Sequence, residues 1–452
     1  MVGYKATTRT TPTRRAAIIG PPTDMSKPPA TNTPPNDKPP RIIIAGWGLM
    51  TPLGLGAWAT FSSLLKGRTL SDRASELPED TAPVDLARAL GSVVSVQHSS
   101  ADPAVELAER AVREAATMAG VSPAGLPLWL GTSKGAIAKV SNQLGLGRPL
   151  TDEIASCLAM GPHAYLSQQL TRRLHTQAKP HYVAACSSGL FALDAARQSL
   201  LNSADNGPNA SPYALVASAD AAITPALVYS YLRLGVLGNM TRDTYTQRPL
   251  DARRQGFMLS EMGAAVLLKR LAPDEQVPEN AIELVDTVTA CEPYDIIRSP
   301  SEMTSLAHLW HRLTADRSID VIHPHAPGTL EHDPAELGVL LPPPSPNGSP
   351  PPDLYAVKGA IGHSLGASGL ASLVVAALSL RSGKRPPMPW LKEPMQLPDG
   401  SQLQANPAMR PCNQSGTHAV LAAGFGGHLA AAVLQGNSRS KAPPAPTQKP
   451  PA

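Results

Sequence analysis

The stretch VAACSSGL at residues 183–190 combines a short apolar run with a cysteine, two serines and a glycine. Behind it, FALDAARQSL at residues 191–200 spaces its apolar side chains as one face of a helix does. We therefore predict a strand, a tight turn and a helix, with the thiol of Cys186 at the N-terminus of the helix. Free N–H groups and the helix dipole at such a position favour a thiolate, which is the nucleophilic form of cysteine.

Two histidines in glycine-containing turns follow far downstream. His325 lies in HPHAPGT (323–329), and His363 lies in KGAIGHSLG (358–366). A cysteine that stands alone before a helix is most often a small core residue, but one cysteine combined with two distant histidines predicts a nucleophilic catalytic site. Three further histidines are interpreted as packed or solvated: His323, His332 and His428.

The composition limits the kind of protein this is. The 452 residues suffice for one large domain or two of ordinary size. With 4% aromatic residues and four Phe, the core must be built from Ala, Leu, Val and Ile. No apolar stretch approaches the ~20 residues of a membrane span. The four cysteines show no metal-ligand or disulfide spacing, so we expect no cysteine metal site and a cytoplasmic location.

The positive charge lies at the two ends of the chain. Residues 1–40 carry +4 and residues 437–452 carry +3, which leaves −3 for the body between them. Both ends are rich in Pro without apolar periodicity, and a third Pro-rich tract occupies residues 342–352. Such composition cannot bury enough apolar surface to fold, so we predict two disordered tails. The negative body argues against nucleic-acid binding.

Between the tails, apolar runs alternate with helical patterns, which predicts an α/β fold with central sheets. A break at residues 271–278 divides the body into an N-terminal half (41–272) and a C-terminal half (273–436). The predicted strands begin with one that closes on a Gly-x-Gly turn at 46–48 and continue at 127–130, 213–220, 263–270, 282–288 and 319–323; the predicted helices run through 58–65, 104–119 and 303–313, and onward from Gly369.

Six motifs in this order resemble a beta-ketoacyl synthase, the elongating ketosynthase branch of the thiolase superfamily, over roughly residues 41–435. They are IAGWGLMTPLG (44–54), ACSSG (185–189), RPLD (248–251) with Arg254, Gly256-Phe257 and Glu261, the spaced set His325, Thr329, Asp333 and Glu336, the five-residue step from Lys358 to His363, and GFGG (424–427). Each motif alone is weak, but the ordered set is strong.

The resemblance implies a thiolase-like fold, with two similar α/β halves in an α/β/α/β/α arrangement of layers. It also implies a decarboxylative Claisen condensation without cofactor or metal. Cys186 would accept the acyl group, and the backbone N–H groups of Cys186 and Phe425 would form an oxyanion hole. His325 and His363, neutral and donating, would stabilise the enolate of the malonyl unit, and Lys358 would add a positive field.

The resemblance extends to substrate and partners. Thr329 would hydrogen-bond the pantetheine arm, and Phe425 would either gate the acyl pocket or pack in the core. An acyl carrier protein would deliver the acyl and malonyl groups, docking on a local Lys/Arg cluster. The chain would form a homodimer or a heterodimer with a sister ketosynthase. Five charged residues of the motifs would form structural ion pairs: Asp251, Arg254, Glu261, Asp333 and Glu336.

Two departures from the family pattern leave alternatives open. Ala326-Pro327 replaces the Gly-Thr after the first histidine, and Ser372 replaces a Glu that would partner Lys358. Either the substrate or its carrier is therefore unusual, or selection on activity has relaxed. We expect an active ketosynthase of fatty-acid-like or polyketide-like synthesis; the alternative is a non-catalytic partner of the chain-length-factor type. A degradative thiolase would need a second cysteine near residues 424–427, and an initiating ketosynthase would have Asn at position 363.

Overall fold

The computed structural model describes residues 40–438, except 94–101, 146–148, 203–210, 239–240, 242–246, 297, 299, 342–350, 398 and 405–407. Nearly all of the two predicted tails and of the proline-rich tract lie outside these residues. The predicted boundary of the C-terminal tail is wrong by one residue, because Asn437 still belongs to the last strand and pairs with Ala281.

The strands are β1 (Ile42–Thr51), β2 (Gly54–Leu55), β3 (Pro127–Gly131), β4 (Gln177–Tyr182), β5 (Tyr213–Asp220), β6 (Met262–Arg270), β7 (Ala281–Cys291), β8 (Val321–His323), β9 (Asp353–Leu354), β10 (Lys384–Arg385), β11 (Arg410–Pro411), β12 (Thr417–Gly424) and β13 (His428–Asn437). The strands predicted at residues 127–130, 213–220, 263–270, 282–288 and 319–323 are present, within a few residues of their predicted ends.

The helices are α1 (Ala57–Leu65), α2 (Pro83–Gly91), α4 (Pro103–Met118), α5 (Ile137–Gly145), α6 (Asp152–Met160), α7 (Pro162–Leu174), α8 (Ser188–Asn202), α9 (Pro225–Arg233), α10 (Thr304–Thr314), α11 (His332–Leu340), α12 (Lys358–Ile361) and α13 (Ser368–Ser382). Short 3₁₀ turns add η1 (Leu70–Glu76), η2 (Ala185–Ser187) and η4 (Leu365–Ala367).

The strand order shows two halves of the same construction. The main sheet runs β4-β3-β5-β6-β1-β7-β13-β12-β8-β9, with β2 attached to β1. In the first half β1 and β6 are antiparallel, β6 and β5 are antiparallel, and β5, β3 and β4 are parallel. In the second half β7, β13, β12, β8 and β9 repeat this pattern. The predicted pair of similar α/β halves is confirmed.

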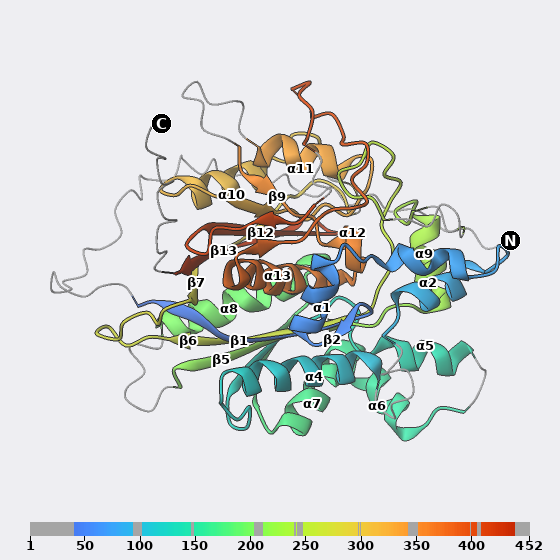
Figure 1. Cartoon of the computed structure of the whole chain (residues 1–452). Helices are drawn as coiled ribbons and strands as arrows, with labels where there is room; N and C mark the ends of the chain where they lie inside the picture. The colour runs from blue at the N-terminus through green and yellow to red at the C-terminus, as the bar shows by residue number, and fades with distance from the viewer. Residues whose placement is uncertain are drawn as a thin grey trace, which may run out of the picture. The chain divides into compact units, whose positions relative to one another are not determined.

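Helices and sheets alternate in five layers (Figure 1). Helices α8 and α13 lie between the two halves of the sheet, within the largest apolar cluster. Helices α4 and α7 cover the outer face of the first half, and α10 and α11 cover the second. The strands buried on both faces are rich in Ala, Val and Leu, as expected for sheets covered by helices on each side.

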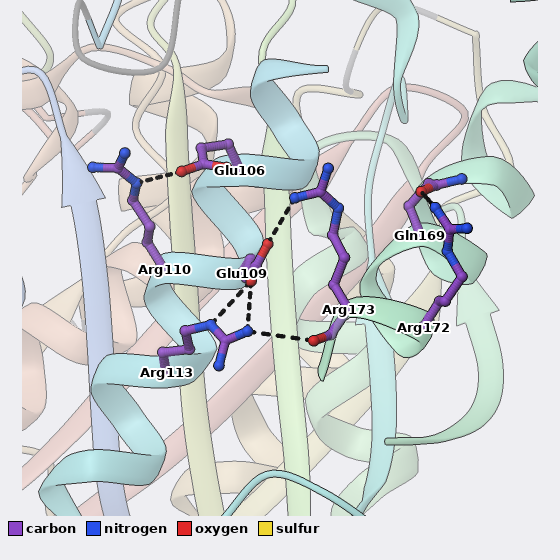
Figure 2. A network of polar contacts seen from close by, with 7 residues as sticks. All are labelled: Glu106, Glu109, Arg110, Arg113, Gln169, Arg172 and Arg173. Carbon is purple, nitrogen blue, oxygen red and sulfur yellow. Dashed lines mark hydrogen bonds and ion pairs between the residues drawn. The ribbon is translucent and has the colours of Figure 1, made fainter. Parts of the chain in front are cut away.

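The outer helices α4 and α7 are also joined by charged groups (Figure 2). Glu109 of α4 accepts hydrogen bonds from Arg113 on its own helix and from Arg173 on α7. Arg113 in turn donates to the backbone carbonyl of Arg173. Exposed ion pairs of this kind contribute little free energy, so the apolar face of α4 carries most of the packing energy of this layer.

The predicted Gly-x-Gly turn at residues 46–48 is wrong, because β1 continues through it to Thr51. A Cβ atom at Gly46 would lie 2.1 Å from Ala115 O, and one at Gly48 would lie 2.0 Å from Ala111 O. The two glycines therefore let the backbone of α4 pack directly on β1, and a larger residue at either position would push the helix away.

One segment, Leu365–Ser382, is long and apolar enough to cross a membrane by length and composition, which the sequence analysis did not expect. In this structure 89% of that segment is buried, because it forms η4 and the central helix α13. The segment therefore has the burial of a core helix.

Candidate active site

Cys186 lies in a strained turn at the start of a central helix. Strand β4 ends at Tyr182, so the predicted apolar strand directly before the cysteine is wrong. Ala185 adopts φ 47, a left-handed conformation that is uncommon for a residue other than glycine. The 3₁₀ turn η2 then leads into α8, where the hydroxyl of Ser188 accepts the N–H of Ala184 at 2.9 Å and donates to Ala185 O at 2.7 Å.

The thiol of Cys186 is surrounded by apolar side chains and is 5% exposed. Its cluster includes Tyr231, Phe257, Met258 and Leu365. Burial raises the pKa of Cys186 to about 12, although Lys358 and the backbone N–H of Phe425 act in the opposite direction. The predicted resting thiolate is therefore wrong: desolvation outweighs the helix N-terminus, and the resting form is the thiol.

The turn GFGG at residues 424–427 packs against the cysteine turn. A Cβ atom at Gly424 would lie 2.5 Å from Ala184 O and 3.0 Å from Cys186 N. This close approach places the backbone N–H of Phe425 beside the sulfur of Cys186. The two N–H donors predicted to form an oxyanion hole are thus neighbours, and only glycine at position 424 permits it.

His325 is fixed by its backbone and by Lys358. Glu336 accepts the backbone N–H groups of His325 at 2.6 Å and of Ala326 at 2.7 Å. The ammonium of Lys358 lies 3.5 Å from His325 Nδ1 and donates to the carbonyl oxygen of the same residue. Burial, together with Lys358 and the neighbouring histidines, holds the pKa of His325 well below its usual value, so the ring is neutral.

His363 faces the same site from the second half of the fold. Its backbone N–H donates to Met258 O at 2.7 Å, and its ring and that of Phe257 form a T-shaped pair with a centroid distance of 4.9 Å. Burial also lowers the pKa of His363 well below its usual value. The centroids of the His325 and His363 rings are 5.5 Å apart, so the two neutral imidazoles can approach one oxygen atom.

Lys358 is a buried cation beside the two histidines, with 2% of its surface exposed. Burial lowers its pKa to about 8, while Glu336, Cys186 and Asp333 raise it. From Ser372 we expected Lys358 to lack a carboxylate partner; Glu336 and Asp333 supply negative charge instead. The ammonium form therefore prevails at neutral pH.

A cavity of about 350 Å³ joins most of the predicted site. Cys186, His325, Thr329, His363 and Phe425 line it, whereas Lys358 lies behind His325 and is not part of the lining.

His332 also lines the cavity, although the sequence analysis assigned it to packing or solvent. Its ring centroid is 5.1 Å from that of His325, and its Nε2 is 3.6 Å from Glu336 Oε2. In the sequence, the four-residue spacing of His332 and Glu336 indicates that the two side chains lie on the same face of a helix and can pair.

The five charged residues of the motifs were predicted to form ion pairs, but in the structure all five bind backbone groups. Among the described residues, Asp251 and Glu336 are the two that also approach a group of opposite charge, Arg253 and His332 respectively. Asp333 accepts the N–H groups of Leu250 and Gly328, and Arg254 donates to the carbonyls of Thr329 and Leu330. All five act in this way at the loops around the site: Asp251, Arg254, Glu261, Asp333 and Glu336.

The sequence matches two family models: the beta-ketoacyl synthase N-terminal domain over residues 40–274 and the beta-ketoacyl synthase C-terminal domain over residues 301–392. The chain therefore belongs to the beta-ketoacyl synthase family.

Its relatives include synthases of type II polyketide systems. It is 26% identical to the tetracenomycin polyketide synthase ketoacyl synthase alpha subunit of Streptomyces glaucescens, covering 87% of this chain and 96% of that protein. It is 25% identical to an oxytetracycline polyketide beta-ketoacyl synthase of Streptomyces rimosus, covering 89% and 98%.

Solved structures with the same fold include a type II polyketide synthase acyl-carrier protein in complex with its ketosynthase bound to the hexaketide, with TM-score 0.71, 17% identity and coverage of 88% of this chain and 100% of that one. The ishigamide ketosynthase/chain length factor gives TM-score 0.67, 20% identity and the same coverage.

Proposed function

We propose that this chain is a condensing beta-ketoacyl synthase of polyketide-type synthesis, acting on acyl and malonyl thioesters carried by an acyl carrier protein. The observation that carries the proposal is the convergence of Cys186, His325 and His363 on one cavity, with Lys358 directly behind His325. A nucleophile, two neutral N–H donors and a cation are the groups that this reaction needs.

In the first step, the sulfur of Cys186 attacks the carbonyl carbon of the acyl thioester. The thiol proton passes to the departing pantetheine sulfur, so the transfer needs no net proton. The oxyanion that forms at the carbonyl oxygen accepts hydrogen bonds from the N–H groups of Cys186 and Phe425. Because the resting thiol is protonated, attack and proton loss are coupled.

In the second step, the malonyl thioester loses CO₂, and the electron pair of the broken bond moves to the thioester oxygen as an enolate. His325 and His363 donate to this oxygen, and Lys358 adds its field. The enolate carbon then attacks the acyl carbon, and Cys186 leaves and takes up one proton. Each condensation therefore consumes one proton, which matches the raised pKa of the Cys186 thiol.

The proposed partners are an acyl carrier protein and a second ketosynthase-type subunit. Two of the similar solved structures are a ketosynthase with a carrier protein and a ketosynthase/chain length factor. Arg298 lines the cavity and is exposed, so it provides positive charge for an acidic carrier. Carrier binding should weaken as salt rises.

A non-catalytic role as the chain-length-factor-type subunit of a heterodimer is the second candidate. Burial of Cys186 and the raised pKa of its thiol favour it, as does Ala326-Pro327 in place of Gly-Thr. The retained set of Cys186, His325, Lys358 and His363 favours the catalytic role.

Intact-mass analysis after incubation with a panel of acyl-carrier thioesters separates the two candidates. The catalytic role requires a mass gain of one acyl group that disappears in Cys186→Ala and persists in the control Cys157→Ala, because Cys157 lies on α6 outside the cavity. It also requires release of CO₂ from the malonyl carrier. If the chain neither becomes acylated nor releases CO₂, alone or with a sister subunit, only the non-catalytic role remains.

A further inference from the structure

The buried hydroxyl of Ser368 lies against His363. Ser368 begins α13 and is 2% exposed. Its Oγ lies 2.7 Å from His363 Nδ1 and accepts the backbone N–H of Ser364 at 2.9 Å. Within the described part of the chain these two groups are its only hydrogen-bond partners, so they decide where its single proton goes.

Only one arrangement satisfies every donor. A serine hydroxyl has one proton and can accept from other groups at the same time. If His363 Nδ1 carried a proton and donated it to Ser368, the hydroxyl proton would be left buried without an acceptor. If Ser368 donates to Nδ1, the hydroxyl proton, the ring nitrogen and the N–H of Ser364 are all satisfied.

The first half of the fold provides a comparison. Ser188 begins α8 as Ser368 begins α13, and it likewise accepts the N–H of the residue four positions earlier, Ala184. Its own proton goes to the carbonyl oxygen of Ala185 at 2.7 Å. Both serines therefore accept a backbone N–H group at the start of their helix. They differ in the group beside the hydroxyl, which is a carbonyl oxygen for Ser188 and a histidine ring for Ser368.

We infer that Ser368 is a positioning residue that holds His363 as the Nε2–H tautomer by donating its hydroxyl proton to Nδ1. His363 lines the cavity, and its Nε2 has no partner among the described residues, so Nε2–H is available to an enolate oxygen. Lys358 faces Nδ1 of His325 at 3.5 Å, and an ammonium can only donate. Both rings therefore present the same tautomer to the cavity.

The tautomer can be observed directly by ¹⁵N NMR of the full chain labelled at histidine, with the signals of His363 identified by their loss in His363→Gln. The wild type and Ser368→Thr should show the Nε2–H form, and Ser368→Ala should show a mixture. The control Ser379→Ala removes a buried hydroxyl from the same helix, where it donates only to Val375 O, and should leave the tautomer unchanged.

The relevance of the tautomer to catalysis rests on the proposed function, so a kinetic measurement accompanies the spectrum. Ser368→Ala should release CO₂ from the malonyl carrier ~3- to 10-fold more slowly, the range for one lost hydrogen bond. Acylation of Cys186 should proceed as in the wild type, and Ser368→Thr should restore the rate.

An Nδ1–H form of His363 in the wild type would overturn the inference, and this result needs no variant to fold. A pure Nε2–H form together with full activity in Ser368→Ala would overturn it as well. If the wild type shows the Nε2–H form but neither becomes acylated nor releases CO₂, the tautomer assignment stands and the proposed function fails.

Discussion

Titration of Lys358 should limit the proposed decarboxylation at alkaline pH. The ammonium is buried, which lowers its pKa from 10.5 to about 8, and it lies 3.5 Å from Nδ1 of His325. Because a lowered pKa means that a base loses its charge earlier, the positive field is present below about pH 8 and disappears as the pH rises through that value.

The distance sets the size of the effect. At an effective dielectric constant of ~20, two unit charges separated by the 3.5 Å between Lys358 Nζ and His325 Nδ1 interact with an energy of about 5 kcal/mol. The enolate oxygen would lie on the far side of the imidazole ring, at roughly twice that distance, which leaves about 2 kcal/mol of stabilisation. This corresponds to a ~30-fold decrease in rate when Lys358 loses its proton.

The assay is the rate of CO₂ release from a malonyl carrier thioester, from about pH 6 to about pH 9.5, in the wild type, in Lys358→Met and in the control Lys392→Met. The wild type and the control, whose lysine is exposed, should lose rate around pH 8. Lys358→Met should remain at the low rate throughout. A decrease near pH 8 that persists in Lys358→Met would assign the titration to another group and refute the reasoning.

Three further variants test the packing and the charges around the site. Gly424→Ala places a Cβ atom 2.5 Å from Ala184 O and should slow acylation of Cys186 by ~10²-fold or more, measured by mass gain; an unchanged rate would contradict the proposed oxyanion hole. Ala326→Gly should stabilise the fold by about 1 kcal/mol in denaturant unfolding, because Ala326 has φ 31; a loss of stability would show that the residue is not strained. Burial raises the pKa of Glu261 to about 7, so its contribution to stability is lost as the pH rises from about 4.5 through 7. The free energy of unfolding of Glu261→Gln relative to the wild type should therefore rise by about 2 kcal/mol between about pH 5 and about pH 8. A difference in stability that stays constant with pH would contradict the raised pKa of Glu261.

Local patterns predicted the elements of the fold because each depends on a short stretch of chain. The strand predicted at residues 213–220 is β5 with the same ends, since an apolar run bounded by polar residues has few alternatives. Gly46 and Gly48 were misassigned to a turn because their reason lies in α4, more than sixty residues away, whose backbone occupies the space of their side chains.

The chemistry of the site was predicted less well, because it depends on what surrounds each group in three dimensions. The residue types of the site followed from the motifs, but the protonation state of Cys186 did not. Its thiol is desolvated by side chains from α9 and from residues 257–259, which no local pattern reveals. His332 was assigned to packing or solvent because its spacing to Glu336 indicates a pair on one helix but not that α11 brings this pair to the cavity.

The repeated construction explains why the nucleophile and the histidines come from different halves. The turn before α13 repeats the turn before α8, with Leu365 at φ 41 where the first has Ala185 at φ 47, and with Gly366 at the position of Cys186.

A Cβ atom at Gly366 would lie 2.7 Å from both Asp220 Oδ2 and Ser133 N, so the second turn has no room for a nucleophilic side chain. The hydroxyl of Ser218 lies 2.6 Å from Gly131 O and 3.0 Å from Gly366 O, and its contact with Gly366 joins this turn to β5 of the first half. With its turn filled in this way, the second half contributes His325, Lys358 and His363. All the proposed catalytic groups therefore lie in one chain, and a second subunit is not needed to supply any of them.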